Sequence, residues 1–178
     1  MKKLTVAGAC CIAIVISGCT ANAPQESGFP QVPQRSGVQV DGPQYDSQTA
    51  LREQARVVAV VEFSEVLARG TEGEFLGGDP AGLPSELWRT RVLRASKGAP
   101  SGTLLVVKPD ASKVADTVPI SAGEQAVLFV SPTSMKYQGA TVYAPVGVDQ
   151  GTVPLINGKP SPAVGSEALK ATLRAWSP

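Results

Sequence analysis

Short Val-rich segments separated by glycine and proline fill residues 47–178, and this pattern restricts the region to a mainly β fold. β-Branched residues are favoured in strands, whereas Gly and Pro mark the turns between them. The segments expected to form strands are residues 56–67, 87–95, 103–108, 125–130, 141–148 and 151–156. Strands this short and this closely spaced favour a small antiparallel barrel or sandwich.

The first two of these segments predict which side chains face the interior. Residues 56–67 (RVVAVVEFSEVL) are too apolar at their start for simple alternation, which indicates burial on both faces or bending into a barrel. Residues 87–95 alternate well. Their two faces are predicted to consist of Trp88, Thr90 and Val92, and of Arg89 and Arg91.

Helices are predicted at both ends of the region. Residues 47–55 suit a short helix that leads into the first strand. For residues 166–176, Ser166 is a suitable N-cap and an apolar stripe predicts an amphipathic helix. The stripe consists of Leu169, Leu173 and Trp176. We expect this C-terminal helix to form a lid on the end of the barrel.

Glycine and proline also predict where the strands are interrupted. Asn157-Gly158 is a strong signal for a type I′ hairpin turn. Ser131-Pro132 is expected to end the strand at 125–130, and Gly70 to Pro84 is expected to be a long Gly-rich loop.

The order of these segments resembles a recurrent domain of actinobacterial and other Gram-positive surface lipoproteins. The resemblance covers residues 47 to about 165 and rests on LWRTRVLRASKG, TLLVVKPD and ISAGEQAVLFVSP after the Val-rich segment. It implies an OB-like, netrin-module-like β-barrel and a location in the cell envelope, and it implies no activity. The inhibitory role of netrin modules is not implied, because the amino-terminal disulfides on which it depends are absent.

The amino terminus has the features of a signal peptide. Two lysines precede the apolar run 4–16, which as a helix reaches about 20 Å and is too short for a hydrocarbon core of about 30 Å. Ile16-Ser17-Gly18-Cys19 follows and resembles the bacterial lipobox. The resemblance implies that residues 1–18 are removed by cleavage between Gly18 and Cys19, and that Cys19 carries a diacylglycerol group.

Two alternatives to this interpretation are ordinary secretory cleavage and an uncleaved anchor. Ala21-Asn22-Ala23 has the A-x-A form of a secretory cleavage site, but Pro24 would follow the cut. The shortness of the apolar run argues against the uncleaved anchor. We therefore expect an extracytoplasmic, lipid-anchored protein of the cell membrane.

Residues 19–46 are rich in Pro, Gln, Gly and Ser and show no apolar periodicity. Such a segment cannot bury enough apolar surface to offset its ordering entropy, so we expect a flexible tether. The alternative is a docking peptide, since Phe29 and Val32 stand nearly alone among polar residues. The folded domain is expected over residues 47–178.

Several classes of chemistry are excluded by composition. The chain has no histidine, and its three cysteines, Cys10, Cys11 and Cys19, all lie in the signal or at its cleavage site. The expected domain therefore lacks the residues for Ser-His-Asp or Cys-His catalysis, zinc sites and disulfides. Nucleotide-binding and G-x-S-x-G motifs are absent, and a net charge of +1 gives no drive toward nucleic acid. We expect a non-enzymatic protein without cofactor or metal.

The candidate binding surface combines the Gly70–Pro84 loop with the basic strand face. Its residues are Glu72, Glu74, Asp79, Arg89 and Arg91. Long Gly-rich loops on a barrel commonly bind ligands, and paired arginines suit a polyanion such as a wall polymer or a lipid headgroup. The partner expected is therefore an envelope protein, a cell-wall polymer or a glycolipid.

Two other functions are compatible with the sequence. Loop carboxylates that approach one another would suit a small glycan hydrolase. Glu62 and Glu65 do not suit this role, because they point to opposite faces if their strand is regular. The second alternative is a purely structural envelope protein.

The lipobox makes a direct prediction about membrane attachment. In Cys19→Ala the acceptor thiol is removed, so we expect the protein to leave the membrane fraction and to lose its lipid mass in intact-protein mass spectrometry. Ser17→Ala keeps a small residue at its position and serves as the matched control. Membrane partitioning of Cys19→Ala at the wild-type level would contradict the lipid anchor.

Overall fold

The computed structural model describes residues 42–176 apart from 76, 79 and 99–101. The predicted signal peptide, the lipidation site Cys19 and most of the predicted tether lie outside the described residues, as does Asp79. No helix within the described part of the chain is long and apolar enough to cross a membrane.

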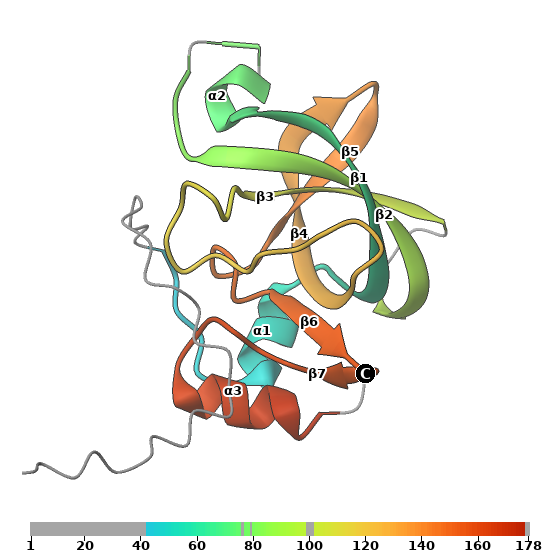
Figure 1. Ribbon diagram of the computed structural model, residues 1–178, viewed down its shortest axis with the longest axis vertical. Helices are drawn as coiled ribbons and strands as arrows, with labels where there is room; N and C mark the ends of the chain where they lie inside the picture. Colours follow the sequence, from blue (N-terminus) through green and yellow to red (C-terminus); the bar gives the residue numbers. More distant parts are fainter. Residues whose placement is uncertain (1–41, 76, 79, 99–101, 177–178) are drawn as a thin grey trace, which may run out of the picture. The chain divides into compact units, whose positions relative to one another are not determined.

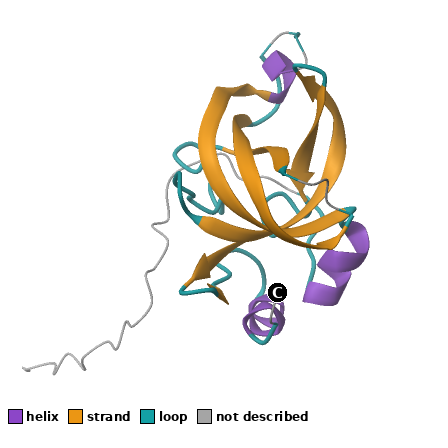
Figure 2. Ribbon diagram, turned by 90° about the vertical axis from the view of Figure 1, so that its right-hand side faces the viewer, coloured by secondary structure: helices purple, strands orange, loops and turns teal. Residues whose placement is uncertain are grey.

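The described part folds around a small OB-like β-barrel, as predicted (Figures 1 and 2). The sheet order is β1-β2-β3-β5-β4-β6-β7, and pairing of β1 with β4 closes the first five of these strands into a ring. The β3–β5 pair is parallel and the other pairs are antiparallel. The strands are β1 (Val57–Thr71), β2 (Pro84–Lys97), β3 (Thr103–Pro109), β4 (Gln125–Tyr137), β5 (Ala140–Pro145), β6 (Thr152–Ile156) and β7 (Lys159–Pro160).

β1 is buried on both faces at its start, which confirms the prediction from its apolar sequence. One set of alternate side chains lines the barrel interior, and Val58 faces outward but is also fully buried. The interior set packs around Phe63 and Trp88, whose rings meet edge to face with centroids 5.4 Å apart. The other fully or nearly fully buried members of this core are Val57, Ala59, Val61, Leu104, Val106, Ala126, Leu128 and Val130.

Two helices cover the outer face of β1 and β4. They are α1 (Gln48–Gln54) and α3 (Glu167–Arg174), and the hydroxyls of Ser47 and Ser166 accept hydrogen bonds from their first turns. This second core contains Leu51, Ala55, Val58, Val127, Phe129, Val153, Leu169 and Leu173. The C-terminal helix is therefore not a lid on the barrel end as expected. Its Leu169 and Leu173 pack with outward-facing side chains of the sheet, because alternation leaves those side chains unburied without it.

Several strand bounds differ from those predicted. The segment predicted as a strand over residues 141–148 is β5, which ends at Pro145 because a turn over residues 146–151 follows it. β4 continues beyond Pro132 to Tyr137. Pro132 lies opposite Tyr143, at the point where the pairing with β5 becomes irregular. Proline is tolerated there because a residue at a bulge does not need to donate a backbone hydrogen bond. The expected loop 70–84 is shorter, because β1 extends to Thr71 and α2 (Glu72–Phe75) follows it. The Asn157-Gly158 turn is confirmed as type I′: both residues have positive φ, 52° and 74°, and join β6 to β7.

The folded unit begins before Ser47. The backbone N–H of Tyr45 donates to Gln150 Oε1 at 3.0 Å, and Gln150 Nε2 donates to Gln44 Oε1 at 2.7 Å. Ser166 Oγ lies 3.1 Å from Asp46 Oδ1. Residues 42–46, assigned from sequence to the tether, therefore lie against the domain beside α3.

The second core predicts the effect of a single truncation. In Leu173→Ala we expect the free energy of unfolding to fall by about 2–5 kcal/mol, because Leu173 is fully buried between helix and sheet. The adjacent control Arg174→Ala removes a half-exposed side chain and is expected to change it by less than about 0.5 kcal/mol. Urea unfolding followed by circular dichroism gives both values. Equal effects of the two substitutions would contradict the burial of Leu173 in the core between α3 and the sheet.

Candidate functional site

The predicted basic face exists, but its charges are already paired. Arg89 and Arg91 are exposed on the outer face of β2, opposite buried Trp88 and Thr90, as the alternation predicted. Arg91 Nη2 lies 3.0 Å from Glu62 Oε2, and Arg89 Nη1 contacts Glu65 Oε1. The site therefore carries acidic groups beside the arginines, which reduces its attraction for a polyanion.

A β-bulge brings these two glutamates to the same face, contrary to the prediction. Glu62 pairs with Arg91 and Phe63 with Thr90, but the next pairing joins Glu65 to Arg89, so Ser64 is an extra residue in β1. An extra residue on one strand breaks the two-residue alternation. Glu62 and Glu65 therefore both point outward, each opposite an arginine, and the assumption of a regular strand was wrong.

The acidic loop residues do not join the arginines. Glu74 lies in α2, and its Oε2 accepts a hydrogen bond of 2.6 Å from the backbone N–H of Thr71. Glu72 begins the same helix, and its side chain lies outside the described part, as does the whole of Asp79. Among the described residues, no group of three or more Asp, Glu, Cys or His side chains is placed to hold a metal ion.

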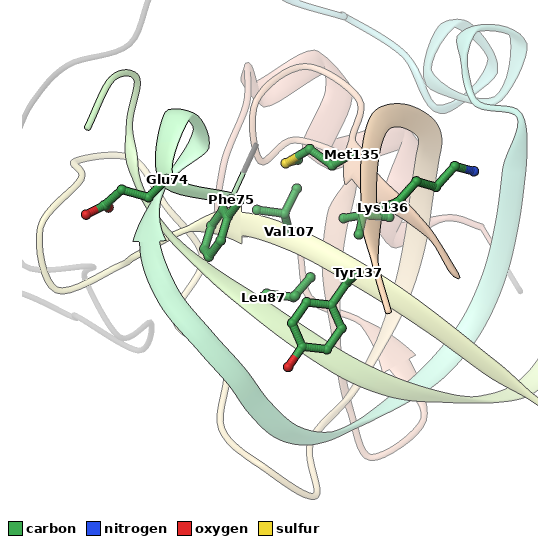
Figure 3. Close-up of a pocket in the computed structure, with 8 residues that line it drawn as sticks. Glu74, Phe75, Leu87, Val107, Met135, Lys136 and Tyr137 are labelled. Carbon is green, nitrogen blue, oxygen red and sulfur yellow. The ribbon is translucent and has the colours of Figure 1, made fainter. Parts of the chain in front are cut away.

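A pocket that the sequence did not predict opens on the outer face of the barrel (Figure 3). Its volume is about 190 Å³. Each neighbouring element contributes apolar side chains to its wall: Phe75 from α2, Leu87 from β2, Val107 from β3, Met135 and Tyr137 from β4, and Val142 from β5. These residues belong to a third hydrophobic cluster, separate from the barrel interior and from the core beneath the helices.

The geometry of the strands explains why this third cluster retains a pocket. β3 and β5 pair only at Leu105–Val142 and Val106–Tyr143, so the two strands separate beyond this point. β4 is irregular between Pro132 and Lys136, where it leaves its regular pairing with β5. The pocket therefore lies over β2 and β3, between the β1–β2 connection and the β4–β5 hairpin. This is the face on which OB barrels bind their ligands.

The pocket is suited to apolar binding. Glu74 and Lys136 are the charged residues among those that line it, and Figure 3 shows both charged groups pointing away from its centre. The ammonium of Lys136 instead donates to Thr141 Oγ1 at 2.7 Å. A volume of 190 Å³ exceeds the 150 Å³ or so of an engineered apolar cavity that accepts benzene. One aromatic ring or one branched aliphatic group therefore fits.

A buried ion pair is the second feature that the sequence did not reveal. Lys108 Nζ lies 3.4 Å from Asp149 Oδ2, with the side chains 2% and 0% exposed. Lys108 also donates to the carbonyl of Val118 at 2.7 Å, and Asp149 Oδ2 accepts from the N–H of Val118 at 2.6 Å. Burial raises the pKa of Asp149, and the positive charge of Lys108 opposes that rise. The pair thus fixes the β3–β4 connection to the turn before β6.

Nothing in the local sequence indicates this pair, since Lys108 and Asp149 are far apart in the chain. The pocket residues are similarly scattered over several strands and α2, and most of them have the apolar character of core residues.

Comparison with protein-family models found no match, and a search of curated proteins found no similar protein.

The buried pair predicts a strongly non-additive mutant cycle. Lys108→Met and Asp149→Leu singly are each expected to lower the free energy of unfolding by about 3–5 kcal/mol, because each leaves one buried charge without its partner. The double variant leaves neither charge and is expected to be much less destabilised than the two single effects added together. Urea unfolding of the four proteins measures the coupling, and additive effects would contradict a buried charge pair.

Proposed function

We propose that the protein is a lipid-anchored, extracytoplasmic binding module that holds an envelope partner in the pocket over β2 and β3. The observation that carries this proposal is the apolar pocket of about 190 Å³, open on the face that OB barrels use for ligands. Apolar side chains left in a concave site favour binding, because a ligand removes them from water.

The position of the pocket supports an anchored module. Figures 1 and 2 place α1, α3 and the β6–β7 hairpin at one end of the described unit and α2 with the β4–β5 hairpin at the other. Residues 44–46 contact Gln150 and Ser166, so the chain enters the domain at the helix end. A lipid on Cys19 would then attach the domain by its helix end, and residues 19–41 would span at most about 80 Å when extended. The pocket would then lie at the end of the domain opposite the point of attachment.

The other functions considered have less support. A glycan hydrolase needs two carboxyl groups about 5–10 Å apart in a cleft, and the described carboxylates near the pocket are held elsewhere: Glu74 by Thr71, and Glu62 and Glu65 by arginines. A purely structural spacer has no need of an open apolar pocket. We therefore retain a binding module as the function.

Filling the pocket is the sharpest test of this proposal. In Val107→Phe the added ring occupies the space that the ligand needs, so we expect in-cell crosslinking of the full-length protein to lose its specific adduct. Stability is expected to stay within about 1 kcal/mol of wild type or to rise, since the ring enters existing space.

The matched control is Ile156→Phe, which adds a ring at an exposed position on β6, at the helix end of the unit. This control is expected to keep the adduct. Retention of the same adduct by Val107→Phe, with the fold intact by circular dichroism, would overturn the pocket as the binding site.

A further inference from the structure

The proposed function does not specify the chemical class of the ligand. The residues around the pocket indicate which class fits. We infer that the occupant is an extended segment of a partner polypeptide, with one aromatic or branched apolar side chain in the pocket and an acidic side chain beside Arg89. This inference rests on the proposed function and deepens it.

The size of the pocket favours a single side chain. Pockets that enclose whole small-molecule ligands measure about 300–1,000 Å³, whereas this one measures about 190 Å³. A long acyl chain or a sugar chain would leave most of its length outside. A polypeptide can instead anchor one side chain in the pocket while its neighbouring side chains lie on the surrounding surface.

Side chains on the sheet surface beside the pocket have the same spacing as alternate side chains of an extended peptide. On the outer face of β2, Leu87 in the pocket wall is followed two residues later by Arg89. Across the sheet, Arg89 pairs with Leu105 of β3, and Leu105 pairs with pocket residue Val142 of β5. Same-face neighbours along a strand are about 6.6–6.8 Å apart. A segment lying along β2 would therefore place its own alternate side chains at the pocket and at Arg89.

Arg89 presents a guanidinium on the pocket side of an exposed ion pair with Glu65. Arg89 lies between Leu105 on the pocket side and Glu65 on the far side, because the strand order is β1-β2-β3-β5. The Arg89 and Glu65 side chains are about half exposed, 47% and 53%. An exposed pair of this kind contributes little to stability, and a guanidinium has five N–H donors. An incoming carboxylate can therefore share Arg89 without breaking the fold.

Met135 provides a reporter inside the pocket wall. The chain has two methionines, Met1 and Met135, so methyl-labelled methionine gives at most two signals, and Met135→Leu assigns them. The full chain in lipid nanodiscs is titrated with the capped heptapeptide TTFTDTT, and with TTDTFTT because the segment can run in either direction. The matched control peptides are TTATDTT and TTFTKTT.

We expect a saturable shift of the Met135 methyl signal with at least one of the two Phe/Asp peptides. Replacing Phe by Ala in the peptide is expected to abolish the shift. Replacing Asp by Lys is expected to weaken binding by about fivefold or more, since an attraction of up to about 1 kcal/mol is lost and a repulsion is added. In Glu65→Arg/Arg89→Glu, which keeps the cross-strand pair but reverses it, the Lys peptide is expected to bind more tightly than the Asp peptide.

Each of the other outcomes contradicts a different part of the inference. Phe-dependent binding that ignores the peptide charge removes the role of Arg89 and leaves the binding module intact. A Met135 shift with phosphatidylglycerol vesicles but with no peptide makes the partner a lipid. If no peptide shifts Met135 while Val107→Phe still loses its adduct in cells, the extended Phe/Asp segment is wrong and the pocket proposal stands.

Discussion

The fold depends on the pairing of β1 with both of its neighbours. β1 runs beside β2 along its length, and its first residues also pair with β4, which closes the ring. Closure removes the free edges that a flat sheet of this size would expose. β1 and β4 also carry apolar side chains on the outer face of the ring, among them Val58, Val127 and Phe129. These side chains would be exposed to water if α1 and α3 did not cover them.

Closure also separates the apolar residues into three clusters, which differ in how completely their side chains fill the space between the elements. The barrel interior and the core under the helices contain fully buried side chains such as Phe63 and Leu173. The third region lies where β3 and β5 separate and the β4–β5 hairpin bends away, and it retains the pocket. The helix end carries the entry of the chain at Tyr45, and the pocket lies toward the opposite end. The proposed anchor and the proposed binding site would therefore occupy different ends of a small domain.

Sequence reasoning succeeded where local chemistry determines structure. The strand segments, the Ser166 cap, the Asn157-Gly158 turn and the outward position of Arg89 all follow from neighbours within a few residues. It failed where distant segments decide the outcome. The bulge at Ser64 is fixed by register with β2, the continuation of β4 past Pro132 by pairing with β5, and the pocket by several strands together. The buried Lys108–Asp149 pair gives no local signal at all.

The central claim is that the pocket exists, open and apolar, before any partner binds. Xenon tests this most directly, because it enters preformed apolar cavities and has no hydrogen-bonding groups. With methyl-labelled methionine, the account predicts a saturable shift of the Met135 signal under xenon in the wild-type protein and its loss in Val107→Phe. A Met135 signal that is unmoved by xenon, or that moves equally in both proteins, would contradict a preformed pocket on this face.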